Sequence, residues 1–131
     1  MAPEPRTIRA YFERQLAELR GSLPSVLAAA IVCEDAAVAA ANDRERLSTV
    51  TAQVRVLVET ARQASGDAGI GQPRCVIVDA LGGILIVRPI ATARPRFIVL
   101  LLADPRDASR ALAGVHRLAN EVEARLAPAS H

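Results

Sequence analysis

Residues 74–103 read RCVIVDALGGILIVRPIATARPRFIVLLLA, and they contain three short runs dominated by Val, Ile and Leu. The runs are 75–78, 84–87 and 97–102. Gly82 and Gly83 lie between the first and second runs, and Pro89 and Pro95 lie between the second and third. Each run is too short for a buried helix and favours extended chain, so three strands are predicted. The breaks are too short for a helical crossover, so the strands form an antiparallel meander.

None of the three runs alternates apolar with polar residues. Strands of this kind are covered on both faces, so the rest of the chain must supply two layers of helix. The stretch therefore predicts an α+β domain with a central antiparallel sheet.

Length and composition set the outer limits of the prediction. A chain of 131 residues corresponds to a single domain, 1–131, with a short leader at 1–6 and a short tail at 127–131. Hydrophobic residues make up 51% of the chain, yet no uninterrupted apolar run approaches the roughly 20 residues of a membrane span. The start, MAPEPRTIRA, lacks the apolar segment of a secretory signal. Cys33 and Cys75 lie in apolar runs and are predicted as buried thiols, so we expect a cytoplasmic protein with no membrane partner.

The charge pattern argues against a nucleic-acid partner. The net charge is only +2, acidic and basic residues are interleaved, and the only aromatic residues are Tyr11, Phe12 and Phe97. All sixteen basic residues are arginine. The absence of lysine removes a P-loop lysine and a Schiff-base lysine from consideration. Enrichment in arginine and alanine indicates a bacterial source with a GC-rich genome.

The N-terminal third predicts a helix followed by a hairpin. Thr7 can cap a helix whose apolar positions fall on one face, and Gly21 with Pro24 ends it. The runs 26–33 and 38–41 are predicted strands joined by a turn at 34–37, although their alanines would equally tolerate helix.

A long helix is predicted from Asn42, which with Glu45 has the spacing of a capping box, to about Ser65. One side is apolar, and the opposite side carries Arg55, Glu59 and Arg62. The apolar or small arc continues through Gln53, Thr60, Thr49 and Val56 to cover roughly 200°, where about 100° is normal for a helix on one sheet face. Either Val and Thr are simply tolerated at the surface, or this side packs against another subunit.

The last helix is predicted from Asp104 as N-cap, with Pro105 in the first position, to near Pro128. The predicted order is therefore helix, two strands, helix, three strands, helix.

No arrangement of residues indicates a catalytic, cofactor or metal site. The string Gly66, Gly69, Gly71 follows a helix and precedes a strand, the reverse of a dinucleotide-binding motif. His116, Cys33 and Cys75 lack zinc-ligand spacing, and no serine lies in a strand-to-helix elbow. We therefore expect a protein that is not an enzyme.

The element order and three segments together resemble the roadblock family, which includes roadblock-type dynein light chains and bacterial regulators of Ras-like gliding-motility GTPases. The segments are 23–26, 83–90 and 97–104, and the resemblance extends from about Ile8 to Leu126. Two features differ from the family pattern: the first hairpin turn has no glycine, and 107–109 lacks the glycine common early in the last helix.

The resemblance implies a five-stranded antiparallel sheet of order 2-1-5-4-3, with the long middle helix on one face and the other two helices on the opposite face. It also implies a homodimer in which the third strands pair at their edges and the middle helices pack together. Cys33 and Cys75 would then lie too far apart for a disulfide within one chain. The implied interface consists of Thr49, Ala52, Val56, Thr60, Arg74, Cys75, Val76, Ile77 and Val78.

The function implied by the resemblance is a non-enzymatic regulator or scaffold for a bacterial Ras-like small GTPase. Arg55, Glu59 and Arg62 are the candidate partner contacts, although a solvated stripe held by charge pairs within the helix would look the same. Two alternatives stay open: an assembly adaptor without effect on nucleotide turnover, and a small-molecule sensor domain with a ligand beneath the strands.

Overall fold

The computed structural model describes residues 5–33, 36–42 and 44–126. Along the chain the helices and strands are α1 (Pro5–Ser22), β1 (Val26–Cys33), β2 (Ala36–Asn42), α2 (Arg44–Asp67), β3 (Val76–Ala80), β4 (Gly83–Ile90), β5 (Arg96–Leu102), the short 3-10 helix η1 (Pro105–Asp107) and α3 (Ala108–Leu126).

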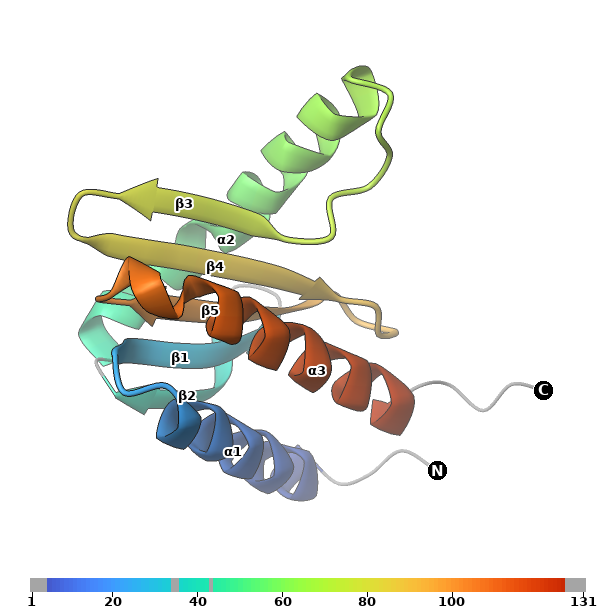
Figure 1. Cartoon of the computed structure of the whole chain (residues 1–131). Helices are drawn as coiled ribbons and strands as arrows, with labels where there is room; N and C mark the ends of the chain where they lie inside the picture. Colours follow the sequence, from blue (N-terminus) through green and yellow to red (C-terminus); the bar gives the residue numbers. More distant parts are fainter. Residues whose placement is uncertain (1–4, 34–35, 43, 127–131) are drawn as a thin grey trace.

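The strands form one antiparallel sheet of order β2-β1-β5-β4-β3, the order that the resemblance implied. Helices α1 and α3 pack on one face and α2 packs on the other (Figure 1). The predicted α+β class, with helices flanking an antiparallel sheet, is confirmed.

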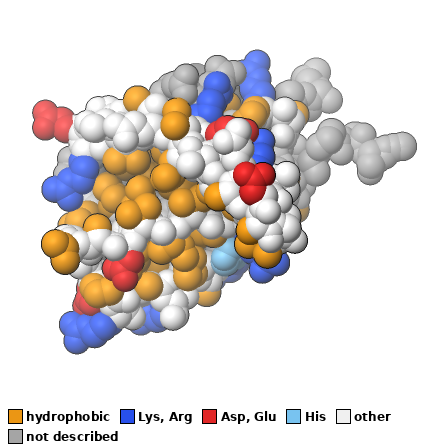
Figure 2. Space-filling model, turned by 90° about the horizontal axis from the view of Figure 1, so that it is seen from above, with side chains coloured by type: hydrophobic (Ala, Val, Ile, Leu, Met, Phe, Trp, Pro, Cys, Tyr) orange, Lys and Arg blue, Asp and Glu red, His pale blue; other side chains and the backbone are white. Residues whose placement is uncertain are grey.

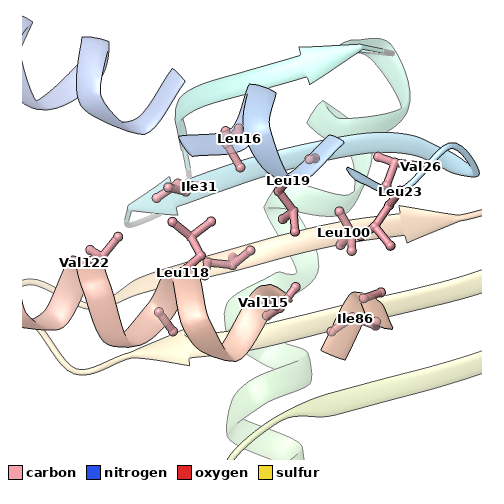
Figure 3. Packing of buried hydrophobic residues seen from close by; sticks show 14 of the residues in the cluster. Leu16, Leu19, Leu23, Val26, Ile31, Ile86, Leu100, Val115, Leu118 and Val122 are labelled. Atoms are coloured by element: carbon pink, nitrogen blue, oxygen red, sulfur yellow. The ribbon is translucent and has the colours of Figure 1, made fainter. Parts of the chain in front are cut away.

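Two apolar layers hold these elements together. On the α1–α3 face, fully buried side chains such as Leu16, Ile31 and Leu100 lie in one cluster with residues of α3 (Figure 3). On the α2 face, Leu47, Val54 and Val58 cover the small alanines of β1 and the valines of β4 and β5. Because β1 offers only alanine to α2 at positions 28 and 30, the helix can lie close to the sheet.

The last connection of the chain matches its sequence signal. Asp104 caps η1, and its side chain accepts a hydrogen bond of 2.9 Å from the Arg106 N–H, with Pro105 in the first helical position. Ser25 Oγ donates to Asp107 Oδ2 at 2.7 Å and so ties the start of β1 to the start of this helical segment.

Three predicted boundaries differ from the observed ones. Asn42 is not a helix cap: it ends β2, where it pairs with Ala28, and α2 begins at Arg44. Helix α1 begins at Pro5 and not after Thr7, since proline suits the first helical turn, and it takes up part of the predicted leader. Positions 36 and 37 of the predicted turn belong to β2, whereas 34–35 lie outside the described residues.

Strand β4 runs through Pro89, which was expected to lie in a break. The pairing of β3 with β4 ends at Val76 opposite Val87, so beyond that point β4 has only β5 as a neighbour. A proline is tolerated where one side of a strand has no partner, because no ladder hydrogen bond is lost there.

Strand β3 differs most from its prediction. The run 75–78 was expected to be covered on both faces, but β3 is the last strand of the sheet and Ile77 and Val78 are 49% and 40% exposed.

Within the described ranges, no helix is long and apolar enough to cross a membrane.

Candidate protein-interaction surface

Exposed large hydrophobic side chains are concentrated in one region of the molecule. Across the part of the chain that the structure describes, all of them fall between positions 56 and 81, on α2, on the connector that follows it, on β3 and on the turn after β3; they are Val56, Ile70, Ile77, Val78 and Leu81. We call this region, with the outer side of α2, the α2–β3 surface. Seen from above, hydrophobic side chains gather in the middle of this side of the molecule, and most charged side chains lie around them (Figure 2).

The outer side of α2 forms one part of this surface. It carries the small and apolar side chains that extend the apolar arc of the helix beyond its sheet-facing side. Thr49, Ala52, Val56 and Thr60 are all exposed, Val56 by 66%. Thr49 Oγ1 donates to the Glu45 carbonyl at 3.3 Å, and Thr60 Oγ1 donates to the Val56 carbonyl at 2.9 Å. Both hydroxyl donors are therefore satisfied within the helix, so this stripe can be buried without stranding a donor.

The β3 edge supplies the second part of the surface. The strand hydrogen-bonds only to β4, so its other edge carries unpaired backbone groups. Cys75 and Val76 are half-buried, whereas Arg74, Ile77 and Val78 are exposed. Burial raises the pKa of the Cys75 thiol, an effect opposed by the Arg88 charge and a backbone hydrogen bond, so this cysteine is protonated at neutral pH.

The predicted partner contacts lie on the same helix. Arg55, Glu59 and Arg62 are all exposed. Arg62 Nη1 and Glu59 Oε2 lie 3.2 Å apart with both side chains about half exposed, and such a pair contributes little to stability. The charges are therefore available for exchange with a partner.

A shallow apolar hollow of about 200 Å³ opens on the α2 face at the β3–β4 turn. It is lined mainly by the sheet residues Leu27, Val78, Leu85 and Leu101, together with Arg46 of α2. The sensor alternative requires a ligand space beneath the strands, whereas this hollow lies at an open corner of the sheet.

One cluster of polar residues has no counterpart in the sequence analysis. Arg88 on β4 donates from Nε to Nδ1 of His116 on α3 at 2.9 Å, and its Nη1 lies 3.8 Å from Oε2 of Glu123. His116 is half-buried and accepts this hydrogen bond. Arg88 lies 28 or more positions from the other two residues, so no spacing motif could have revealed the cluster.

Among the residues with described positions, no group of three or more His, Cys, Asp or Glu side chains is placed to hold a metal ion. Cys33 and Cys75 are free, half-buried thiols.

The fold and its exposed edge define the class of protein to which the chain is similar, the Roadblock/LC7 domain. A Roadblock/LC7 domain from Streptomyces avermitilis matches over 88% of this chain and 98% of its own, with 18% identity and a TM-score of 0.76. MglB of Myxococcus xanthus matches over 100% of this chain and 98% of its own, with 10% identity and a TM-score of 0.68. The gliding protein MglB of Thermus thermophilus matches over 92% and 95%, with 15% identity and a TM-score of 0.60. No protein-family model and no curated protein matches the chain.

At these identities the comparison establishes the fold. The expected similarity to roadblock proteins is confirmed, and the solved neighbours include both Roadblock/LC7 domains and the gliding protein MglB. One of those MglB structures shows a tetrameric arrangement.

Proposed function

We propose that this chain is a non-enzymatic homodimer that binds a bacterial Ras-like small GTPase and modulates its GTP hydrolysis or its localisation. The observation that carries the proposal is the concentration of exposed apolar side chains on the α2–β3 surface. A gathering of exposed apolar side chains on one side of a protein is typical of an interaction site.

The edge of β3 supports self-association. A strand with an apolar sequence and free backbone groups is an aggregation liability unless another strand pairs with it. A second copy of the chain offers the same edge, and two antiparallel copies of β3 satisfy each other's backbone groups around a two-fold axis. The proposed strand contact consists of residues 74–78, with Ile77 and Val78 as its apolar centre.

Helix α2 supports the same arrangement. Its C-terminal half extends past β3, beyond the edge of the sheet (Figure 1). In a dimer whose two-fold axis passes through the β3 edge, perpendicular to the sheet, this overhang lies across the α2 face of the other subunit. There it can cover the hollow formed by Leu27, Val78, Leu85 and Leu101, while the Thr49–Thr60 stripe packs against its symmetry mate.

The GTPase part of the proposal comes from similarity to MglB. The solved neighbours of this chain include MglB proteins, one of them a gliding protein, and the roadblock resemblance implies a regulator of a Ras-like GTPase. Arg55, Glu59 and Arg62 are the proposed contacts because they form a charged stripe beside the proposed dimer contact.

The proposal is tested with a Ras-like GTPase encoded beside the gene for this chain. GTP hydrolysis and complex formation are measured with and without the full chain. The expected result is a complex and a changed hydrolysis rate. A complex with an unchanged rate would favour the assembly-adaptor alternative, whereas neither complex nor rate change would contradict the GTPase proposal.

The charged stripe has its own test. Arg55→Glu reverses an exposed charge without touching the core, so it should weaken GTPase binding by roughly tenfold and leave the dimer mass unchanged. Arg9→Glu on α1 is the matched control, since Arg9 is equally exposed and lies outside the α2–β3 surface. Equal losses for the two variants would show that only overall charge matters.

A further inference from the structure

A second candidate site lies where β3 starts. Strand β3 begins at Val76, opposite Val87, but β4 continues to Ile90, so the last residues of β4 have no neighbour on that side. The connector residues 72–74 close over this gap, with α2 on one face of the sheet and α3 on the other. Together they border a cavity of about 290 Å³ that is open to solvent.

The cavity is lined by three arginines from three separate segments and by one carboxylate. Arg62 comes from α2, Arg74 from the connector and Arg88 from β4, and Glu123 comes from α3. Glu123 Oε2 accepts a hydrogen bond from the Ala91 N–H at 2.8 Å and lies 3.8 Å from Arg88 Nη1, beyond hydrogen-bond distance. Arg62 forms an exposed ion pair with Glu59. Arg88 Nη1 also donates a hydrogen bond to the Pro89 carbonyl. With three arginines against one carboxylate, the lining keeps a net positive charge.

Arg88 is the most enclosed of the three, with a side chain only 13% exposed. Its Nε is held by His116, which must be neutral at Nδ1 to accept that hydrogen bond, so His116 fixes the guanidinium without offsetting its charge. Burial, followed by the charges of Arg88 and Arg74, lowers the pKa of His116 and keeps it in this neutral form.

We propose that this cavity binds a tetrahedral oxyanion of the phosphate type, either free phosphate or the phosphoryl group of a small soluble molecule, between Arg62, Arg74 and Arg88. A single arginine can satisfy the two oxygens of a carboxylate, whereas three arginines from three separate segments offer donors for an anion with more acceptor oxygens. The cavity volume lies at the lower end of small-molecule sites and leaves room beside a phosphoryl group for a small organic moiety. This site goes beyond the proposed function, since it requires no GTPase.

The test is calorimetric titration of the full chain with inorganic phosphate at low ionic strength and pH 7.5, with acetate as a second titrant. Phosphate should bind at one site per chain and acetate should not. Arg74→Ala and Arg62→Ala should each weaken phosphate binding by about tenfold, because both side chains are exposed and their loss leaves the core intact. Arg9→Ala, on α1 and outside the cavity, should bind phosphate like the unchanged chain.

Two results would overturn the site: acetate binding as tightly as phosphate, or an equal loss of phosphate binding in Arg9→Ala and Arg74→Ala. The second result would mean that phosphate senses only the overall charge. Measuring the mass of each variant by light scattering in the same buffer separates a lost anion site from a changed oligomeric state. Titration with a small phosphorylated sugar identifies the source, since tighter binding than that of phosphate indicates contacts beyond the phosphoryl group.

Discussion

Gly83, the first residue of β4, lies close to the backbone of Leu102 on β5. Its φ is +151°, and a Cβ built there would lie 2.4 Å from the Leu102 carbonyl oxygen. A side chain at this position would meet both an unfavourable backbone conformation and a backbone atom that cannot move away. A Cβ built on the neighbouring Gly82 would have no atom within 4 Å.

The two glycines therefore provide a matched pair. Gly83→Ala should destabilise the fold by roughly 2–4 kcal/mol, through backbone strain and a steric clash. Gly82→Ala should change stability by about 0.5 kcal/mol or less. Urea denaturation followed by circular dichroism, at one protein concentration, measures both. Equal effects of the two substitutions would show that the close approach to Leu102 does not constrain the turn.

His116 makes a second prediction, on pH dependence. Its pKa in the folded chain is below the ordinary value, so between the two values the unfolded chain binds more protons. The stability contribution of neutral His116 is therefore complete above the ordinary pKa of about 6.5 and is lost as the pH falls toward the folded value. His116→Asn keeps an acceptor near the Nδ1 position but cannot be protonated, so it should flatten the stability difference between pH 7.5 and pH 5.5. Melting temperatures at the two pH values provide the measurement; an unchanged difference would mean that other groups cause it.

At the scale of secondary-structure elements, α2 and β3 carry the functional prediction. Val56 lies in the middle of the small and apolar stripe of α2 and is 66% exposed. Val56→Glu should leave the fold of the single chain intact and weaken self-association by about 100-fold, because an unpaired charge would be buried in the interface. Analytical ultracentrifugation over a concentration series measures the shift.

Ala17→Glu is the control for this substitution. Ala17 is exposed on α1, away from the α2–β3 surface, so it introduces the same charge without entering the proposed interface. If both variants dissociate equally, or if neither does, α2 is not the contact.

The bounds of some helices and strands can be predicted from their own residues, whereas those of others depend on neighbouring elements that the sequence does not show. Strand β1 has the predicted bounds because its apolar run has clear limits on both sides. Strand β4 extends through Pro89 only because β3 has already ended, and this depends on the register between the two strands. The outer side of α2 could be predicted because helical periodicity exposes a surplus apolar arc. The cluster of Arg62, Arg74, Arg88, His116 and Glu123 could not, since it is assembled by the sheet from positions far apart in the chain.

At the scale of the whole molecule, the two sides of the sheet differ in how completely they are covered. The α1–α3 side forms a closed core, whereas α2 covers part of its side and extends beyond the β3 edge (Figure 1). The overhang, the free strand edge and the uncovered corner all lie on the α2–β3 surface. Our central claim is that a second copy of the chain covers this surface and so completes the platform that a GTPase would bind.

The mass of the protein in solution tests that claim most directly. Light scattering at tens of micromolar should give about twice the chain mass of 13.9 kDa for the unchanged protein, and a value falling toward the chain mass for Val56→Glu. A mass of 13.9 kDa for the unchanged protein would contradict the claim.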